Sequence, residues 1–125
     1  MAACFDETTS PELVKSYASY MSAQVSIPWQ QKTFLAHGHS VSCRLFLEND
    51  AYSDFSSVFL ISQDSLQPAS RLSLPDIYGD PVNLLWTVPV FEHERKRLQE
   101  SNNLSLLDPV IHGERYPLIR CRSSL

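Results

Sequence analysis

Residues 82–100 read VNLLWTVPVFEHERKRLQE, and this stretch decides the fold class. Its first part places apolar residues at alternate positions over 82–88, which is the period of a half-buried β-strand. Trp86 lies on the inward side of that strand, so we expect it in the core. Pro89 cannot donate a backbone hydrogen bond, so we expect the strand to stop there. The sequence therefore predicts a strand that leads directly into a helix over roughly 90–100.

The expected helix over 90–100 is rich in charged side chains. Glu92 and Lys96 form an i,i+4 pair, and the helix faces other than the apolar one are expected in solvent. Residues 101–103, SNN, interrupt the helix. Asparagine tolerates the left-handed turn that commonly ends a helix. A short leucine-rich turn over 104–108 is expected next.

Another helix is expected near the start of the chain. Ser10 is a suitable N-cap, Pro11 suits the first helical position and Glu12 is an early acid. The helix must end before Pro28, because the residue preceding a proline is pushed away from the α region. Residues 1–9 are interpreted as a flexible lead-in.

The middle of the chain predicts a β-hairpin. Residues 41–47 alternate apolar and polar side chains, 48–54 are polar and turn-prone, and 55–61 are rich in β-formers. Residues 58–61, VFLI, are apolar throughout, so both faces of that strand are expected to be buried. For the basic segment 115–122, an edge strand and a tail both stay open.

These elements predict a single α+β domain over residues 10–125, with a mixed, largely antiparallel β-sheet and helices packed against it. A chain of 125 residues has room for one core, and its 43% hydrophobic content is typical of a globular protein. No internal repeat divides the chain.

Composition and charge exclude several classes of function. The net charge is −4 and there is no lysine-rich tract, which argues against nucleic-acid binding. Apolar runs are far shorter than the ~20 residues of a membrane span. Asp6 and Glu7 stand where a secretory signal would be positive, so we expect a cytoplasmic protein. The three cysteines include no CxxC pair and are expected as reduced thiols.

Some residues could carry chemistry, but their patterns are incomplete. His37, His39 and Cys43 could form a nucleophilic or metal site, yet no third group is specified and a turn leading into a strand explains them. His93 begins a segment that is similar to a zinc-protease helix, but that motif needs a second histidine where Arg97 stands. We therefore expect a solvated helix stripe at 93–97.

The remaining patterns also lack essential members. Glu48, Asp50 and Asp54 cluster in a turn, but the glycine and final glutamate of a calcium-binding loop are missing. The glycines are not grouped as in a phosphate-binding loop. We expect no enzyme activity, no metal and no cofactor. For Trp29, an exposed anchor and a lid over the core both stay open.

Residues 72–108 resemble the suppressor-of-fused domain family. The resemblance rests on a hydrophobic strand ending in a W-x-V-P phrase, a helix with an E-x-E-R-like element and a leucine-rich turn; the matching residues are Leu74 to Asp76, Val82 to Val90, Glu92, Glu94, Arg95 and Leu104 to Leu107. The resemblance implies an α+β fold and a non-enzymatic role in holding a protein partner. Small bacterial members of the family look like immunity proteins.

These observations lead to a functional prediction. We expect an immunity-type protein that binds and neutralises a toxin or effector, possessing an acidic surface that suits a basic partner. The candidate partner-binding residues are Asp76, Tyr78, Asp80, Glu92 and Glu94, because they flank the ends of the expected strand and helix. An alternative is a regulatory scaffold that sequesters a transcription or signalling factor, for example by adding a peptide strand to an exposed sheet edge. A small hydrolase using Cys43 and a histidine is a third hypothesis.

Overall fold

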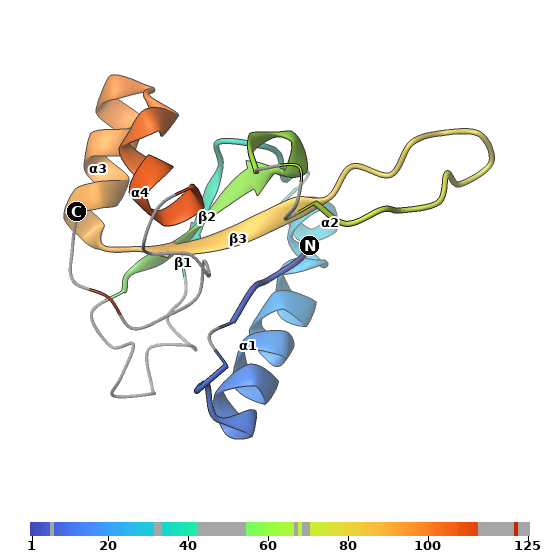
Figure 1. The fold of residues 1–125 in the computed structure, drawn as a ribbon, viewed down its shortest axis with the longest axis horizontal. Helices are drawn as coiled ribbons and strands as arrows, with labels where there is room; N and C mark the ends of the chain where they lie inside the picture. The colour runs from blue at the N-terminus through green and yellow to red at the C-terminus, as the bar shows by residue number, and fades with distance from the viewer. Residues whose placement is uncertain are drawn as a thin grey trace.

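The computed structural model describes residues 1–5, 7–31, 34–42, 55–66, 68, 71–112 and 122 (Figure 1). Within these residues the fold is α+β, with a mixed, largely antiparallel sheet and helices on both of its faces. The predicted fold class is confirmed. In this part of the chain no helix has the length and apolar character needed to cross a lipid bilayer.

The described sheet has the strand order β1-β2-β3, and both neighbouring pairs are antiparallel. Its strands are β1 Ser40–Ser42, β2 Ser57–Ser62 and β3 Leu85–Val90. Val41 lies opposite Val58 in the first pair, and Phe59 lies opposite Val88 in the second. The antiparallel β1–β2 pair agrees with the predicted hairpin, whose connection over 43–54 lies outside the described residues.

Helical segments precede and follow the sheet. They are α1 Pro11–Gln24, α2 Ile27–Gln30, η3 Gln63–Ser65, α3 Glu92–Ser101, η5 Leu104–Leu107 and α4 Asp108–Ile111. The predicted start of α1 is confirmed, because Ser10 Oγ accepts a hydrogen bond of 3.3 Å from the Leu13 amide. α1 ends before Pro28, as predicted. Pro28 itself lies in the first turn of α2, where its missing N–H is tolerated.

The sheet is the middle of three layers (Figure 1). One core lies on the α1 face and is made by Leu13, Tyr17, Tyr20, Phe55, Val58 and Leu60. The other lies on the face of α3 and α4 and includes Phe59, Ile61, Trp86, Val88, Val90, Leu98, Leu107 and Val110. Both faces of 58–61 are therefore buried, as predicted, and so is Trp86. Each large apolar side chain buried in this way contributes roughly 1.5–3 kcal/mol.

The bounds of β3 differ from the prediction. The strand begins at Leu85 rather than Val82, and it continues through Pro89 to Val90. Pro89 faces Val58 across the pair with β2. The backbone bonds to β2 alternate along β3 and leave Pro89 with its nitrogen directed to the outer edge, where proline is accepted. The prediction that Pro89 stops the strand is wrong for this reason.

The first residues of the chain are attached to the sheet. Ala2 forms a parallel bridge with Trp86, donating a hydrogen bond of 2.8 Å to Leu85 O and accepting one of 2.9 Å from the Thr87 amide. This arrangement differs from the flexible lead-in expected for residues 1–9. Sequence pattern missed it because a single bridge needs no β-rich run.

Candidate functional site

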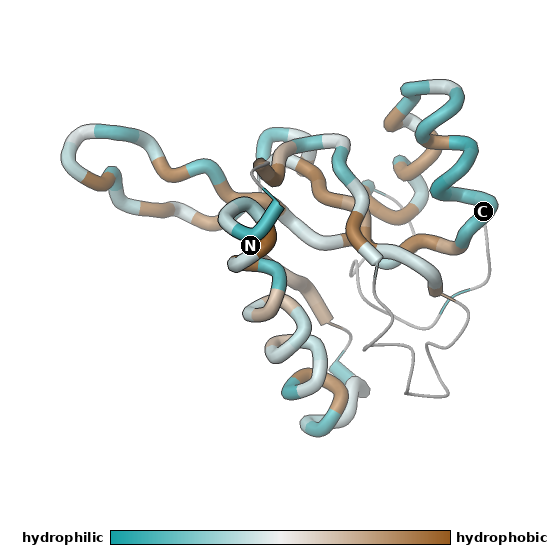
Figure 2. Tube along the Cα trace, turned by 180° about the vertical axis from the view of Figure 1, so that it is seen from behind, coloured by the Kyte–Doolittle hydropathy of each residue, from teal (hydrophilic) through white to brown (hydrophobic). Residues whose placement is uncertain are grey.

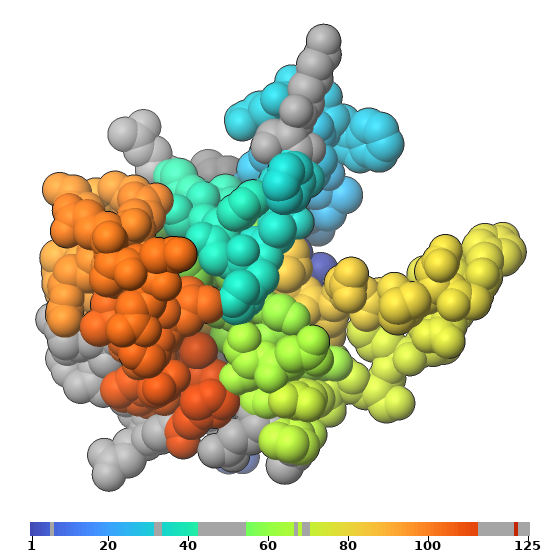
Figure 3. Space-filling model, turned by 90° about the horizontal axis from the view of Figure 1, so that it is seen from above, coloured from blue at the N-terminus to red at the C-terminus, as the bar shows by residue number. Residues whose placement is uncertain are grey.

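An arm formed by residues 72–83 extends away from the body between η3 and β3 (Figures 1 and 3). Every residue of the arm is exposed. Its base is fixed by Gln63, whose side chain accepts a hydrogen bond from the Leu72 amide at 2.9 Å and donates one to Leu72 O at 2.8 Å. Trp86 Nε1 donates to the same Gln63 oxygen at 3.3 Å. The arm is thus tied at its base to the buried core.

The tip of the arm is a tight turn. Ile77 and Asp80 exchange two backbone hydrogen bonds of 2.9 Å. The two residues between them have positive φ, 52° at Tyr78 and 83° at Gly79. Paired positive φ values in a two-residue hairpin loop are typical of the type I′ turn. The glycine-containing sequence of 76–80, DIYGD, predicts a tight turn here, and the structure confirms it.

Tyr78 occupies a position that does not suit it. Asn-Gly is the favoured pair for this turn, whereas a bulky residue in the left-handed region costs roughly 1–2 kcal/mol. The Tyr78 side chain is 102% exposed, so it gains no burial that would offset this strain. A strained and fully exposed aromatic side chain indicates a function outside the fold.

The arm combines apolar and acidic side chains. Its exposed apolar residues are Leu72, Leu74, Ile77, Tyr78 and Val82. Figure 2 shows hydrophobic and hydrophilic stretches following one another along the arm. Asp76 and Asp80 flank the tip, and residues 72–83 contain no lysine or arginine. Pro75 and Pro81 restrict the backbone on either side. The tip therefore presents Ile77 and Tyr78 between carboxylates.

The structure gathers some of the predicted site residues and separates others. Asp76, Tyr78 and Asp80 lie together at the tip of the arm. Glu92 is exposed in the first turn of α3, which lies at the other end of β3 (Figure 1). A strand of this length separates the two regions by roughly 20 Å. The predicted residues therefore do not form one continuous surface.

Glu94 is buried, so the prediction that it lies on the surface is wrong. Its side chain is 3% exposed and that of Arg122 is 2% exposed. Arg122 Nη1 and Nη2 each donate a hydrogen bond of 2.8 Å to Glu94, one to each carboxylate oxygen. Glu94 Oε2 also accepts a hydrogen bond of 3.0 Å from the Phe91 amide, which helps to cap α3. Glu94 thus has a structural role within the described contacts.

Arg122 lies over two aromatic rings, those of Phe55 and Phe91, which contact each other with centroids 4.6 Å apart. Its guanidinium carbon is 5.3 Å from the ring centroid of Phe55 and 5.2 Å from that of Phe91. Nη2 also donates a hydrogen bond of 2.9 Å to Pro89 O, at the outer edge of β3. The ion pair between Glu94 and the basic segment 115–122 was not predicted from the sequence. No motif could have identified it, because the ion pair joins residues far apart in the chain.

The neighbouring Glu92 is exposed and forms a different set of contacts. The Arg95 guanidinium hydrogen-bonds its carboxylate, and Lys96 Nζ lies 3.9 Å from Glu92 Oε1, which confirms the predicted i,i+4 pair. The hydrogen bond from Arg95 is the main cause that lowers the pKa of Glu92 from 4.5 to about 2, with a smaller effect from Ser56. A lowered pKa means that this carboxylate favours the folded state above pH 4.5 and loses that contribution as pH falls to about 2.

We expect the Glu92 carboxyl to titrate near pH 2 in a ¹³C NMR experiment on the folded protein. Replacing Arg95 with glutamine removes the charged donor, so the midpoint should move back toward 4.5. Lys96→Gln is the matched control and should move the midpoint less, because its contact is longer. A midpoint near 4.5 in the unmodified protein would contradict the geometry of the Glu92–Arg95 pair.

The histidines do not form a recognisable catalytic arrangement with described neighbours. His37 is exposed and its Nδ1 accepts a hydrogen bond of 2.8 Å from the Ser62 amide. The ring of His39 packs against Phe34, with centroids 5.3 Å apart. Cys43, together with the acids at 48, 50 and 54, lies outside the described residues. In the described ranges no three histidine, cysteine or acidic side chains gather in a way that could hold a metal ion.

Trp29 is 85% exposed on α2, so the alternative of a lid over the core is not realised. The sequence matches no family model and no curated protein, and the fold matches no solved structure. The resemblance of residues 72–108 to the suppressor-of-fused family therefore stays a prediction.

Proposed function

We propose that this protein is a non-enzymatic, cytoplasmic protein-binding domain of the immunity type, which neutralises a toxin or effector by inserting the arm into a cleft of that partner. The observation that carries the proposal is Tyr78, a strained and fully exposed aromatic residue at the tip of a projecting turn. Tyrosine is enriched among the residues that dominate binding energy at interfaces. The immunity role itself comes from the family resemblance.

The construction of the arm supports insertion rather than loose contact. Its tip is closed by paired backbone hydrogen bonds and its base is held by the Gln63 side chain. A preorganised segment loses little conformational entropy on binding. A narrow, firm tip suits a concave site, where Ile77 and Tyr78 would be removed from water together.

The charge of the arm supports a basic partner. Asp76 and Asp80 are its acidic side chains, and the whole chain carries a net charge of −4. Complementary charges steer association and exclude partners of the same sign. At 0.1 M salt, the attraction between exposed charges is largely screened beyond about 10 Å. The association rate should therefore drop as salt is added.

The test compares proteins captured by the unmodified chain and by a variant with Ile77→Ser and Tyr78→Asn. Asparagine accepts the left-handed conformation, so the turn should persist while the apolar tip is lost. We expect a basic protein to be retained by the unmodified chain and bound at least about tenfold more weakly by the variant. Affinity is then measured by calorimetry with the purified partner, at low and high salt.

Val14→Ser is the matched control, since Val14 is an exposed apolar residue on α1 outside the arm. It should bind the partner as the unmodified chain does. The captured protein's own activity should be inhibited by the unmodified chain and restored in the presence of the arm variant. Equal binding by the arm variant would refute the arm as the interface. Binding without inhibition, to a transcription or signalling factor, would favour sequestration over immunity.

A further inference from the structure

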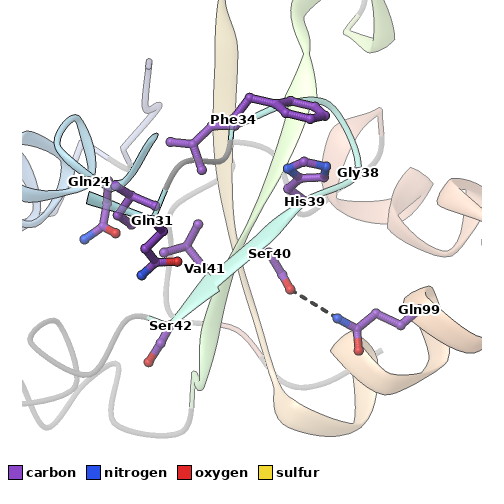
Figure 4. A pocket seen from close by; sticks show the side chains of 11 residues that line it. Gln24, Gln31, Phe34, Gly38, His39, Ser40, Val41, Ser42 and Gln99 are labelled. Atoms are coloured by element: carbon purple, nitrogen blue, oxygen red, sulfur yellow. Dashed lines mark hydrogen bonds between the residues drawn. The ribbon is translucent and has the colours of Figure 1, made fainter. Parts of the chain in front are cut away.

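A groove runs along β1 on a part of the molecule that the arm does not reach (Figure 4). It encloses about 650 Å³. Residues of β1 and of the preceding turn form its floor, α1 and α2 contribute one wall, and Gln99 of α3 lies on the other side. No residue of the arm lines it. The groove is therefore a separate site from the one assigned to the proposed function.

Within the described part of the chain, the floor of the groove is an outer edge of the sheet. β1 is the first strand in the order β1-β2-β3, and Leu60 donates a backbone hydrogen bond of 2.8 Å to His39 O. Backbone groups alternate in direction along an antiparallel strand. The backbone N–H and C=O of Val41 are therefore directed to β2, and those of Ser40 and Ser42 are directed outward. The Tyr20 hydroxyl donates to Ser42 O at 2.8 Å, which agrees with that alternation. The amides of Ser40 and Ser42 and the carbonyl of Ser40 thus face the groove.

The two walls of the groove differ in character. The Val41 side chain points toward α1 and α2 (Figure 4). Ile27 of α2 and Leu35, which packs against the core on the α1 face, add apolar lining to that side. Ser40 points the other way, where its hydroxyl accepts a hydrogen bond of 3.3 Å from Gln99 Nε2. An extended chain lying between these walls would direct alternate side chains to an apolar and to a polar surface.

Among the described residues, the lining carries neither an acid nor a lysine or arginine. A charged side chain entering the groove would lose hydration without gaining an opposite charge, which is unfavourable. An uncharged segment has no such cost. The described lining thus favours an uncharged segment, whereas the acidic arm favours a basic partner.

We propose that the groove binds an extended, uncharged peptide segment of a partner protein, which adds to β1 as a further strand. Only another extended backbone offers donors and acceptors at the spacing of Ser40 and Ser42. An apolar residue of that segment packs on the Val41 side while its neighbour faces Ser40 and Gln99. The site acts independently of the arm, so either one can be tested and lost without the other.

The probe is a pool of capped peptides in which valine or leucine alternates with serine or threonine. We expect members of the pool to shift the amide resonances of Ser40 and Ser42 in ¹⁵N NMR spectra and to leave Tyr78 and Gly79 unchanged. A second pool with lysine or glutamate at the apolar positions should bind at least about tenfold more weakly. Absence of any shift at Ser40 and Ser42 with the first pool would overturn the proposal.

N-methylation of the best peptide tests strand addition itself. Methyl groups on the alternate amides that face β1 remove the hydrogen bonds and should weaken binding about tenfold or more, while methyl groups on the other set should not. Equal binding of both methylated forms would exclude strand addition. On the protein, Ile27→Glu places a charge in the apolar wall and should weaken binding, whereas Val25→Glu, on an exposed residue outside the lining, should not.

Discussion

Replacing Arg122 with alanine should lower the free energy of unfolding by about 3–5 kcal/mol, because it removes the cation from a buried ion pair. The Glu94 and Arg122 side chains are 3% and 2% exposed, so water cannot replace the lost hydrogen bonds. The substitution also removes the guanidinium from its position over the Phe55 and Phe91 rings. Urea unfolding followed by far-UV circular dichroism measures the change.

Two controls separate burial from charge. Arg95→Ala breaks the exposed pair with Glu92 on the same helix, and exposed pairs contribute only about 0–1 kcal/mol. Combining Glu94→Gln with Arg122→Met removes both charges and should recover much of the stability lost in Arg122→Ala. A loss below about 1 kcal/mol for Arg122→Ala would show that Arg122 does not pair with a buried carboxylate.

Replacing Trp86 with alanine should lower the free energy of unfolding by about 3–5 kcal/mol. The indole is 4% exposed in the core beneath α3 and α4, and its Nε1 donates to Gln63. The substitution removes a large apolar group and leaves a cavity between the strand and the helices. Circular dichroism is again the appropriate probe, because the substitution changes the tryptophan fluorescence.

The chain offers its own control in Trp29. This tryptophan is 85% exposed, so Trp29→Ala should change stability by no more than about 0.5 kcal/mol. A comparable loss for the two tryptophans would contradict the placement of Trp86 in the core. Retained stability in Trp86→Ala would do the same.

Sequence patterns predicted the elements whose formation depends on residues close together in the chain. The N-cap at Ser10 and the proline after it set the start of α1 without help from distant residues. The uninterrupted apolar run over 58–61 required a strand that is covered on both faces. The turn at Tyr78 and Gly79 was predictable from its polar, glycine-containing pattern. Each of these depends on neighbours within a few residues.

Features that depend on distant partners were not predictable. Glu94 and the exposed Glu92 both lie in the first turn of α3, and the ion pair that buries Glu94 comes from Arg122, far away in the sequence. Pro89 is accepted within β3 because that strand lies at the outer side of the sheet, which no local pattern encodes. Val82 continues the apolar alternation of β3 but belongs to the arm. The alternation alone does not show whether other elements of the fold cover Val82.

The contacts of Ala2 and Arg122 have a shared consequence for how the protein resists aggregation. Ala2 forms hydrogen bonds with the Leu85 carbonyl and the Thr87 amide, and Arg122 donates one to the Pro89 carbonyl. Segments from far apart in the chain therefore cover the outer backbone of β3. An uncovered strand edge is a template for pairing with other chains. Proteolytic removal of either residue would therefore expose backbone groups of β3 that can pair with a strand of another molecule.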